Sequence, residues 1–206
     1  MNFTSRKKRP LNREIEHLND TSLIYIATEG QETEKQYFES SLFRNRRVQV
    51  RVLETQDGKS APSHVFKRLK KLLKEIHYQE NDRFWLMVDK DRTKEAHLSK
   101  VCSEAFGHKK IKINLAISNP CFELWLFLHN NEWVEELVSC KDIEKEIKRL
   151  LGSYNKSNID ISTYETKIDH AIKQAKILDK DPSMRWPDNP GTHVYKVVEE
   201  ILKLID

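Results

Sequence analysis

Four apolar stretches in the first 120 residues predict β-strands. Residues 22–28 and 84–89 are rich in aliphatic and aromatic side chains with little polar interruption, which favours strands buried on both faces of a parallel sheet. Residues 48–54 alternate valine with polar side chains, and residues 111–118 form a further apolar run. Each stretch has the length of an ordinary strand, so the chain is expected to contain about four of them.

Apolar positions at helical spacing separate these strands. A helix is expected from Thr33, where Gln36 follows at the spacing of a capping box, and further helices over residues 63–77 and 93–106. The order β-α-β-α-β-α-β predicts an α/β fold, a Rossmannoid parallel sheet with right-handed crossovers and helices on both faces.

The remaining chain is predicted to be helical. Asn119 as N-cap and Pro120 at the first helical position predict a helix start after the fourth strand. Later helices are expected up to Gly152, around residues 164–178 and over 194–205, with a proline-rich loop over 181–190. The expected organisation is a basic N-terminal tail (1–20), an α/β catalytic core (21–130) and a C-terminal helical extension packed on it (131–206).

Two of the predicted strands end in carboxylates. Glu29 follows the first strand, while Asp89 and Asp91 follow the third, so the three would converge if these strands were neighbours in a parallel sheet. Carboxylates at such an edge suit Mg²⁺. Glu34 is a candidate additional ligand, and Glu123 is a candidate catalytic residue at the same edge. Each of these residues also has an ordinary interpretation as a surface, capping or helix-dipole carboxylate.

A strand ending in Glu-Gly, followed by a later strand ending in D-x-D, resembles the pattern of Toprim domains, which occur in topoisomerases, primases and overcoming-lysogenization-defect nucleases. More closely, the chain resembles the RloB family over about residues 20 to 205. The segments that carry this resemblance are Thr28-Glu29-Gly30, Glu32-Thr33-Glu34, Tyr37-Phe38, Val88-Asp89-Lys90-Asp91, Ser118-Asn119-Pro120-Cys121-Phe122-Glu123-Leu124-Trp125 and Asn189-Pro190-Gly191-Thr192.

The resemblance implies a Toprim-like bacterial protein associated with restriction loci and abortive phage defence. The expected activity is metal-dependent cleavage of phosphodiesters, with Glu29, Asp89 and Asp91 holding one or two Mg²⁺ or Mn²⁺ ions. The substrate would be DNA or RNA, including host transfer RNA, and an ATPase encoded nearby would control it. Two alternatives stay open: a nucleotidyl transferase of the primase type, and a non-catalytic module that binds nucleic acid or a protein partner.

Charge is distributed in basic clusters on a chain whose net charge is only +4. A single cluster is usually a solvated surface, but several beside an acidic metal site suit a phosphate backbone. The residues expected to contact nucleic acid are Lys90, Arg92, Arg46, Arg47 and Lys70.

Cysteine usage and hydropathy bear on the compartment. Cys102, Cys121 and Cys140 are widely spaced and odd in number, which predicts buried or incidental thiols and neither zinc ligands nor disulfides. No apolar run approaches the roughly 20 residues of a membrane span. The chain is therefore expected in the cytoplasm, away from membranes, with self-association into a homo-oligomer left open.

Overall fold

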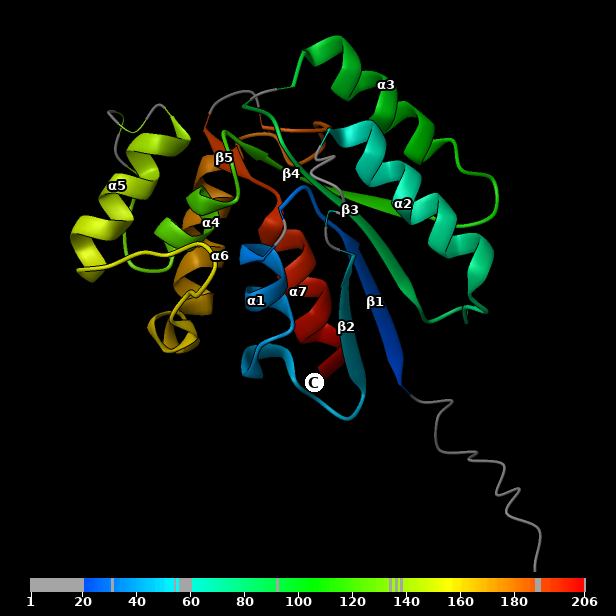
Figure 1. Cartoon of the computed structure of the whole chain (residues 1–206), viewed down its shortest axis with the longest axis horizontal. Coiled ribbons are helices and arrows are strands. Elements are labelled where there is room, and N and C mark those ends of the chain that lie inside the picture. The colour runs from blue at the N-terminus through cyan, green and yellow to red at the C-terminus, as the bar shows by residue number, and fades with distance from the viewer. Residues whose placement is uncertain are drawn as a thin grey trace, which may run out of the picture.

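A five-stranded sheet forms the centre of the part of the chain that the structure describes (Figure 1). The computed structural model describes residues 21–30, 32–53, 55, 61–91, 93–133, 135, 137, 139–187 and 190–205; the expected N-terminal tail lies outside them. The strand order is β2-β1-β3-β4-β5. The strands are β1 (Ser22–Ala27), β2 (Val48–Leu53), β3 (Arg83–Asp89), β4 (Ile113–Asn119) and β5 (Gly191–Thr192).

The four predicted strands are confirmed, and they are parallel to one another. The fifth, β5, was not predicted; it pairs antiparallel with the end of β4, where Ser118 lies opposite Thr192. Their hydroxyl oxygens are 2.8 Å apart and fully buried. This short strand carries the chain from the proline-rich loop back onto the sheet.

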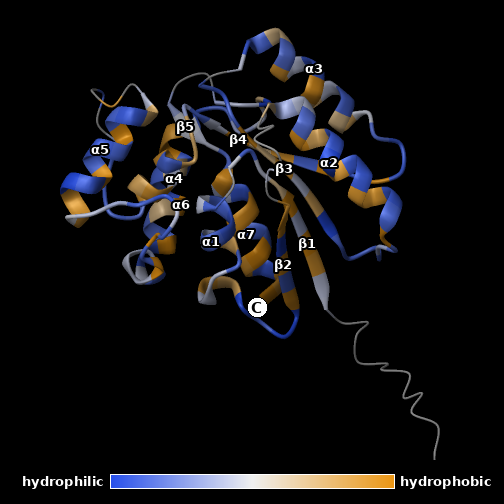
Figure 2. Ribbon diagram, viewed as in Figure 1, coloured by the Kyte–Doolittle hydropathy of each residue, from blue (hydrophilic) through white to orange (hydrophobic). Residues whose placement is uncertain are grey.

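Alternate side chains of the strands serve two different cores, as the two-residue period of a strand requires. Ile24 and Ile26 belong to one hydrophobic cluster, whereas Tyr25 and Ala27 belong to the other. Figure 2 shows the hydrophobic colour concentrated on β1 and β3, while the surrounding helices carry both colours. Both faces of the sheet are therefore covered, which gives a Rossmann-like α/β fold.

The helices divide between the two faces. α2 (Pro62–Glu75) and α3 (Glu95–Phe106) cover one face, and α1 (Thr33–Phe38) and α7 (Val194–Ile205) cover the other (Figure 1). α4 (Glu123–Leu128) follows β4, and α5 (Cys140–Leu151) and α6 (Ile168–Leu178) pack against it. Short 3-10 helices span Ser41–Phe43, Ile161–Thr163 and Glu165–Lys167. Within the described ranges, no helix has the length and apolar character needed to span a bilayer.

One predicted helix cap and one predicted helix start are wrong, although α1 does begin at Thr33 as expected. Thr33 does not cap α1 but is its first residue, and both Thr33 and Gln36 donate side-chain hydrogen bonds to the carbonyl oxygen of Lys156. α4 begins at Glu123 and not at Pro120. Asn119 instead ends β4, precedes a cis peptide bond, and donates from its side chain to the carbonyl oxygen of Pro187. In both cases the side chain donates a hydrogen bond to a segment far away in the sequence and does not cap the helix that follows it.

The order of the strands determines where a ligand can bind. The connection leaving β1 runs to β2 on one side, whereas β3 and β4 extend the sheet on the other, so the order reverses between β1 and β3. In open α/β sheets, ligands bind in the crevice outside the carboxyl ends of the strands at this switch point. Glu29 and Asp89 stand at the carboxyl ends of these two strands.

Candidate functional site

Seven carboxylates line a pocket of about 750 Å³ at the carboxyl edge of the sheet: Glu29, Glu32, Glu34, Asp89, Asp91, Glu123 and Glu144. Three of them follow the two switch-point strands: Glu29 after β1, Asp89 at the end of β3, and Asp91 two residues later. Glu34 comes from the first turn of α1, and Glu123 is the first residue of α4. The expectation that these strand ends meet at one edge is confirmed, and Glu34 and Glu123 lie at the same pocket.

The turn after β1 is fixed by contacts to its backbone. The Thr55 hydroxyl donates to the carbonyl oxygen of Glu29 at 2.6 Å, and Arg68 on α2 donates to the carbonyl oxygen of Thr28 at 2.7 Å and to Thr55 Oγ1 at 3.0 Å. Glu29 Oε1 is buried, and no described residue donates a hydrogen bond to it. The backbone is thus held rigidly, while one carboxylate oxygen is left open to a ligand in the pocket.

Gly30 makes room for the second carboxylate. Its backbone N–H donates to Glu34 Oε1 at 3.1 Å. A Cβ atom at Gly30 would lie 1.9 Å from Glu34 Oε2, far inside van der Waals contact. The glycine therefore serves less to relieve backbone strain than to let a buried glutamate lie against the chain.

Burial and mutual repulsion change the protonation of these groups. The pKa of Glu29 is raised to about 8 in total, chiefly by burial and also by the charges of Asp91 and Glu34, against the lowering effect of the Asp89 N–H and Arg68. Burial, followed by the charge of Glu123, raises the pKa of Glu34 to about 7. Burial and the four neighbouring carboxylates raise the pKa of Asp89 well above its ordinary value. The pocket therefore retains protons at neutral pH when it holds no cation.

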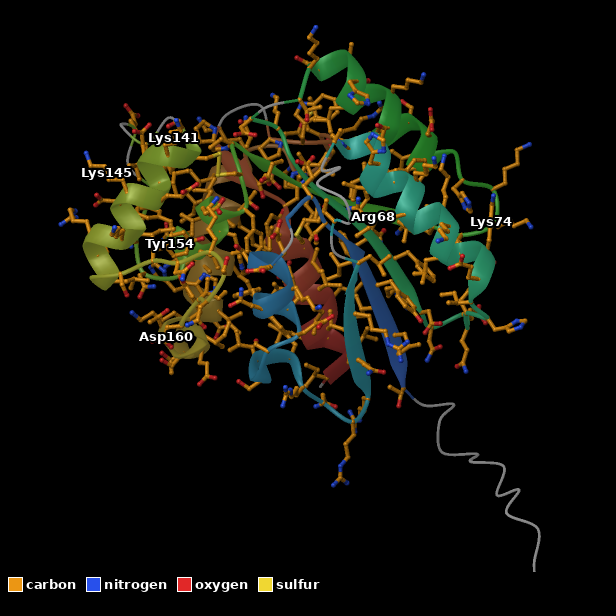
Figure 3. The ribbon with its side chains drawn as sticks, in the orientation of Figure 1. Arg68, Lys74, Lys141, Lys145, Tyr154 and Asp160 are labelled. Carbon is orange, nitrogen blue, oxygen red and sulfur yellow. A yellow bond between two sulfur atoms is a disulfide. The ribbon has the colours of Figure 1, made fainter. Side chains whose placement is uncertain are left out.

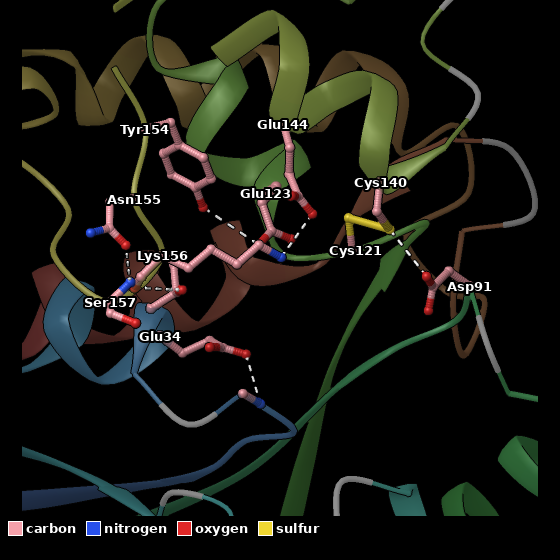
Figure 4. A network of polar contacts seen from close by, with 12 residues as sticks. Glu34, Asp91, Cys121, Glu123, Cys140, Glu144, Tyr154, Asn155, Lys156 and Ser157 are labelled. Carbon is pink, nitrogen blue, oxygen red and sulfur yellow. Dashed lines mark hydrogen bonds and ion pairs between the residues drawn. A yellow bond between two sulfur atoms is a disulfide. The ribbon is translucent and has the colours of Figure 1, made fainter. Parts of the chain in front are cut away.

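Lys156 enters this pocket from the loop between α5 and α6 (Figure 4). Its ammonium nitrogen lies 2.6 Å from Glu123 Oε1 and 2.8 Å from Glu144 Oε1 on α5. Tyr154 donates to the same oxygen of Glu123 at 3.4 Å. Sequence analysis missed Lys156, Glu144 and Arg68, because a lone lysine in a polar loop and an arginine on a basic helix face carry no local signal.

The cysteine prediction is wrong for two of the three residues. Cys121, just before α4, and Cys140, the first residue of α5, form a disulfide at the pocket rim, with their Cα atoms 5.9 Å apart. Cys140 Sγ lies 3.2 Å from Asp91 Oδ2, and Asp91 is exposed (Figure 4). Cys102 is a buried free cysteine, as expected. The pairing was missed because folding, and no sequence motif, brings the starts of α4 and α5 together.

The basic residues expected to contact nucleic acid are scattered. Lys90 lies near the site, its ammonium 6.0 Å from the ring centre of Trp186. Lys70 is on α2, 3.8 Å from Glu104. Arg46 and Arg47 precede β2 and therefore lie at the opposite edge of the sheet from the carboxylates. Arg92 falls outside the described residues.

The carboxylate oxygens at the pocket are of the chemical type that binds a hard divalent cation. Every carboxylate at the pocket supplies oxygen, which is the ligand atom that Mg²⁺ prefers. Glu29 Oε1 is a buried acceptor that receives no hydrogen bond from a described residue. Among the residues described, however, no three His, Cys, Asp or Glu side chains already stand in the arrangement of a metal site. The residues that could hold such an ion are Glu29, Asp89, Asp91 and Glu34.

Comparison with known proteins gives one match. No curated protein and no solved structure matches the chain. The family model described as RloB-like protein matches residues 24–201, which include most of β1, all of β2 to β5, every carboxylate of the pocket, Lys156 and most of α7. The chain therefore belongs to the RloB-like family.

Proposed function

We propose that the protein is a metal-dependent nuclease that cleaves phosphodiester bonds of DNA or RNA at the carboxylate pocket. The observation that carries the proposal is the convergence of Glu29, Asp89 and Asp91 at the switch point of the sheet, with Glu29 Oε1 buried and unpaired. An anionic pocket of this kind repels phosphate on its own. It suits a phosphodiester substrate only when a cation stands between the carboxylates and the phosphate.

Each residue has a distinct part in this proposal. Glu29, Asp89 and Asp91 would hold Mg²⁺ or Mn²⁺, with Glu34 beside them. When bound, such an ion polarises the phosphate, stabilises the leaving oxygen and lowers the pKa of an attacking water. Arg68 and Thr55 keep the Glu29 backbone in place. Lys156 supplies a positive charge at the side of the pocket formed by Glu123.

The biological role is proposed from the family. The sequence resembles proteins associated with restriction loci and abortive phage defence, so we place the cleavage in an anti-phage response. Host transfer RNA is one candidate substrate, and an ATPase encoded nearby is the proposed controlling partner.

The test is incubation of the purified protein with plasmid, single-stranded DNA and total RNA. Parallel reactions contain Mg²⁺, Mn²⁺ or EDTA, with and without the neighbouring ATPase and ATP. We expect shortened products with a divalent cation and none with EDTA. Polymerised nucleotides without cleavage would instead indicate a nucleotidyl transferase. Binding with no turnover in any reaction would indicate a non-catalytic module.

A further inference from the structure

A second hollow, of about 830 Å³, lies between α2 and α3 and is lined mainly by cations. Its charged lining comprises Lys67, Arg68, Lys70, Lys71, Lys74 and Lys100 against a single acid, Glu104. This hollow is called the α2–α3 groove below. Figure 3 shows Arg68 and Lys74 on α2, on the opposite side of the molecule from the lysines labelled on α5.

Three of the six cations in the α2–α3 groove have no ion-pair partner among the residues that the structure describes. Lys70 and Lys71 have weak partners, Glu104 and Glu75, each at 3.8 Å. Lys67, Lys74 and Lys100 are exposed and form no ion pair with any residue that the structure describes. Lysines three and four positions apart on one helix repel one another, so this arrangement opposes helix stability. An external anion would remove that repulsion.

The groove is continuous with the carboxylate pocket. His97 on α3 lines both, and Pro62, the first residue of α2, lines the pocket from which the groove leads away. Arg68 belongs to the groove, yet its guanidinium reaches the carbonyl oxygen of Thr28, next to Glu29. A linear ligand can therefore lie along α2 and α3 with one end at the carboxylates.

We propose that the α2–α3 groove binds the phosphate backbone of a polynucleotide strand and leads it into the carboxylate pocket. α2 has 14 residues and is therefore about 21 Å long, room for several nucleotides. Lysines contact phosphate as point charges, so binding through this groove is independent of sequence. The role of the groove in leading substrate to the pocket rests on the proposed nuclease function, whereas backbone binding by itself does not.

The test compares two triple variants that remove the same charge. One carries Lys67→Ala, Lys74→Ala and Lys100→Ala in the groove. The control carries Lys145→Ala, Lys148→Ala and Lys173→Ala, three exposed lysines on α5 and α6. Fluorescence anisotropy with a labelled single-stranded oligonucleotide, in EDTA so that no metal-dependent cleavage intervenes, gives the affinity between about 50 and 200 mM salt. Circular dichroism melting checks that both variants fold.

We expect the groove variant to bind about ten-fold or more weakly at low salt, and the slope of log K against log salt to shrink by about two. The control should bind within about two-fold of the parent, since loss of net charge alone has a small effect at this ionic strength. Equal loss in both variants, or parental binding by the groove variant, would overturn the proposal.

Cleavage assays on the same proteins separate this inference from the proposed function. If the parent never cleaves but binding still depends on the groove lysines, the nuclease function fails and the binding site stands. If the parent cleaves, and the groove variant binds and cleaves as well as the parent does, the groove assignment fails and the nuclease function stands.

Discussion

The ammonium nitrogen of Lys156 lies 2.6 Å from Glu123 Oε1, so a residue from the C-terminal part of the chain is the counter-ion of a pocket carboxylate. The same nitrogen is 2.8 Å from Glu144 Oε1. The backbone of Lys156 is fixed as well, because its carbonyl oxygen accepts hydrogen bonds from Thr33 at 3.1 Å and Gln36 at 3.0 Å on α1. Lys156 therefore holds a charge at a fixed position between α1, α4 and α5.

Removing that charge should strengthen cation binding. In Lys156→Gln the pocket keeps its carboxylates but loses a cation that repels Mg²⁺ and competes for Glu123. We expect the dissociation constant for Mg²⁺ or Mn²⁺ to fall by about three- to ten-fold, and the cation-free protein to melt at a lower temperature. Calorimetric titration and thermal melting measure the two effects. Lys145→Gln, at an exposed residue of α5, is the control. Weaker cation binding in Lys156→Gln would contradict the idea that Lys156 competes with the metal ion for Glu123.

Isosteric replacement of the switch-point carboxylates should separate chemistry from folding. Glu29→Gln and Asp89→Asn keep size and polarity but remove the negative oxygen, so we expect cleavage to be abolished. Without a cation, both variants should melt at or above the parental temperature, because they remove the buried charge and the repulsion between carboxylates that together raise the pKa of each group. Glu32→Gln, at a residue that lines the pocket but is exposed to solvent, is the control and should retain activity. Full activity in either test variant would refute the assignment.

The raised carboxyl pKa values predict a stability that falls with pH. Folded Glu29 and Glu34 have pKa values of about 8 and 7, against an ordinary 4.5, and the pKa of Asp89 is also raised. The folded state therefore holds more protons than the unfolded state, and this contribution is lost as pH rises from about 4.5 to 8. Burial lowers the pKa of His129 and of His193 to about 4, an effect of opposite sign that ends near pH 6.5.

The informative window is therefore pH 6.5 to 8, in urea unfolding with EDTA. There the free energy of unfolding should fall by roughly 1 to 3 kcal/mol. Glu29→Gln should flatten the profile, and saturating Mg²⁺ should flatten it too, because the cation favours the ionised carboxylates. A parental profile that is level or rises across this window would show that the pocket carboxylates ionise normally.

The sheet and the placement of the main carboxylates could be predicted from sequence because both are local patterns. An apolar run identifies a buried strand, and a polar residue directly after it must lie at the strand end. Glu29 and Asp89 could then be placed at one edge as soon as β1 and β3 were assumed to be neighbours, which they are.

The other parts of the site depend on contacts between distant segments, which leave no periodic pattern. Lys156 lies in a loop and meets Glu123 only after the C-terminal helices have packed. The Cys121–Cys140 disulfide joins the starts of two helices. β5 is two residues long, too short for alternation to be visible. Asn119 does mark the end of β4. Its side chain, however, donates a hydrogen bond to the carbonyl oxygen of Pro187 and does not cap the next helix.

Gly30→Ala should disturb the site without unfolding the protein. The new Cβ would overlap the Glu34 carboxylate, which is the free end of a flexible side chain and can rotate away. Glu34 would then lose its hydrogen bond from the Gly30 N–H and leave its place beside Asp89. We expect cation affinity and cleavage to fall about 10- to 100-fold, the range seen when residues supporting a metal site are changed, while circular dichroism stays native.

A double-mutant cycle shows whether Gly30 acts through Glu34. If it does, Gly30→Ala in a Glu34→Gln background should cost little beyond Glu34→Gln alone, because the side chain that the methyl group displaces no longer carries the charge. Cleavage rates and Mn²⁺ titrations of the parent, the two single variants and the double variant give the coupling. Fully additive losses would mean that Gly30 acts independently of Glu34, through the path of the chain after β1.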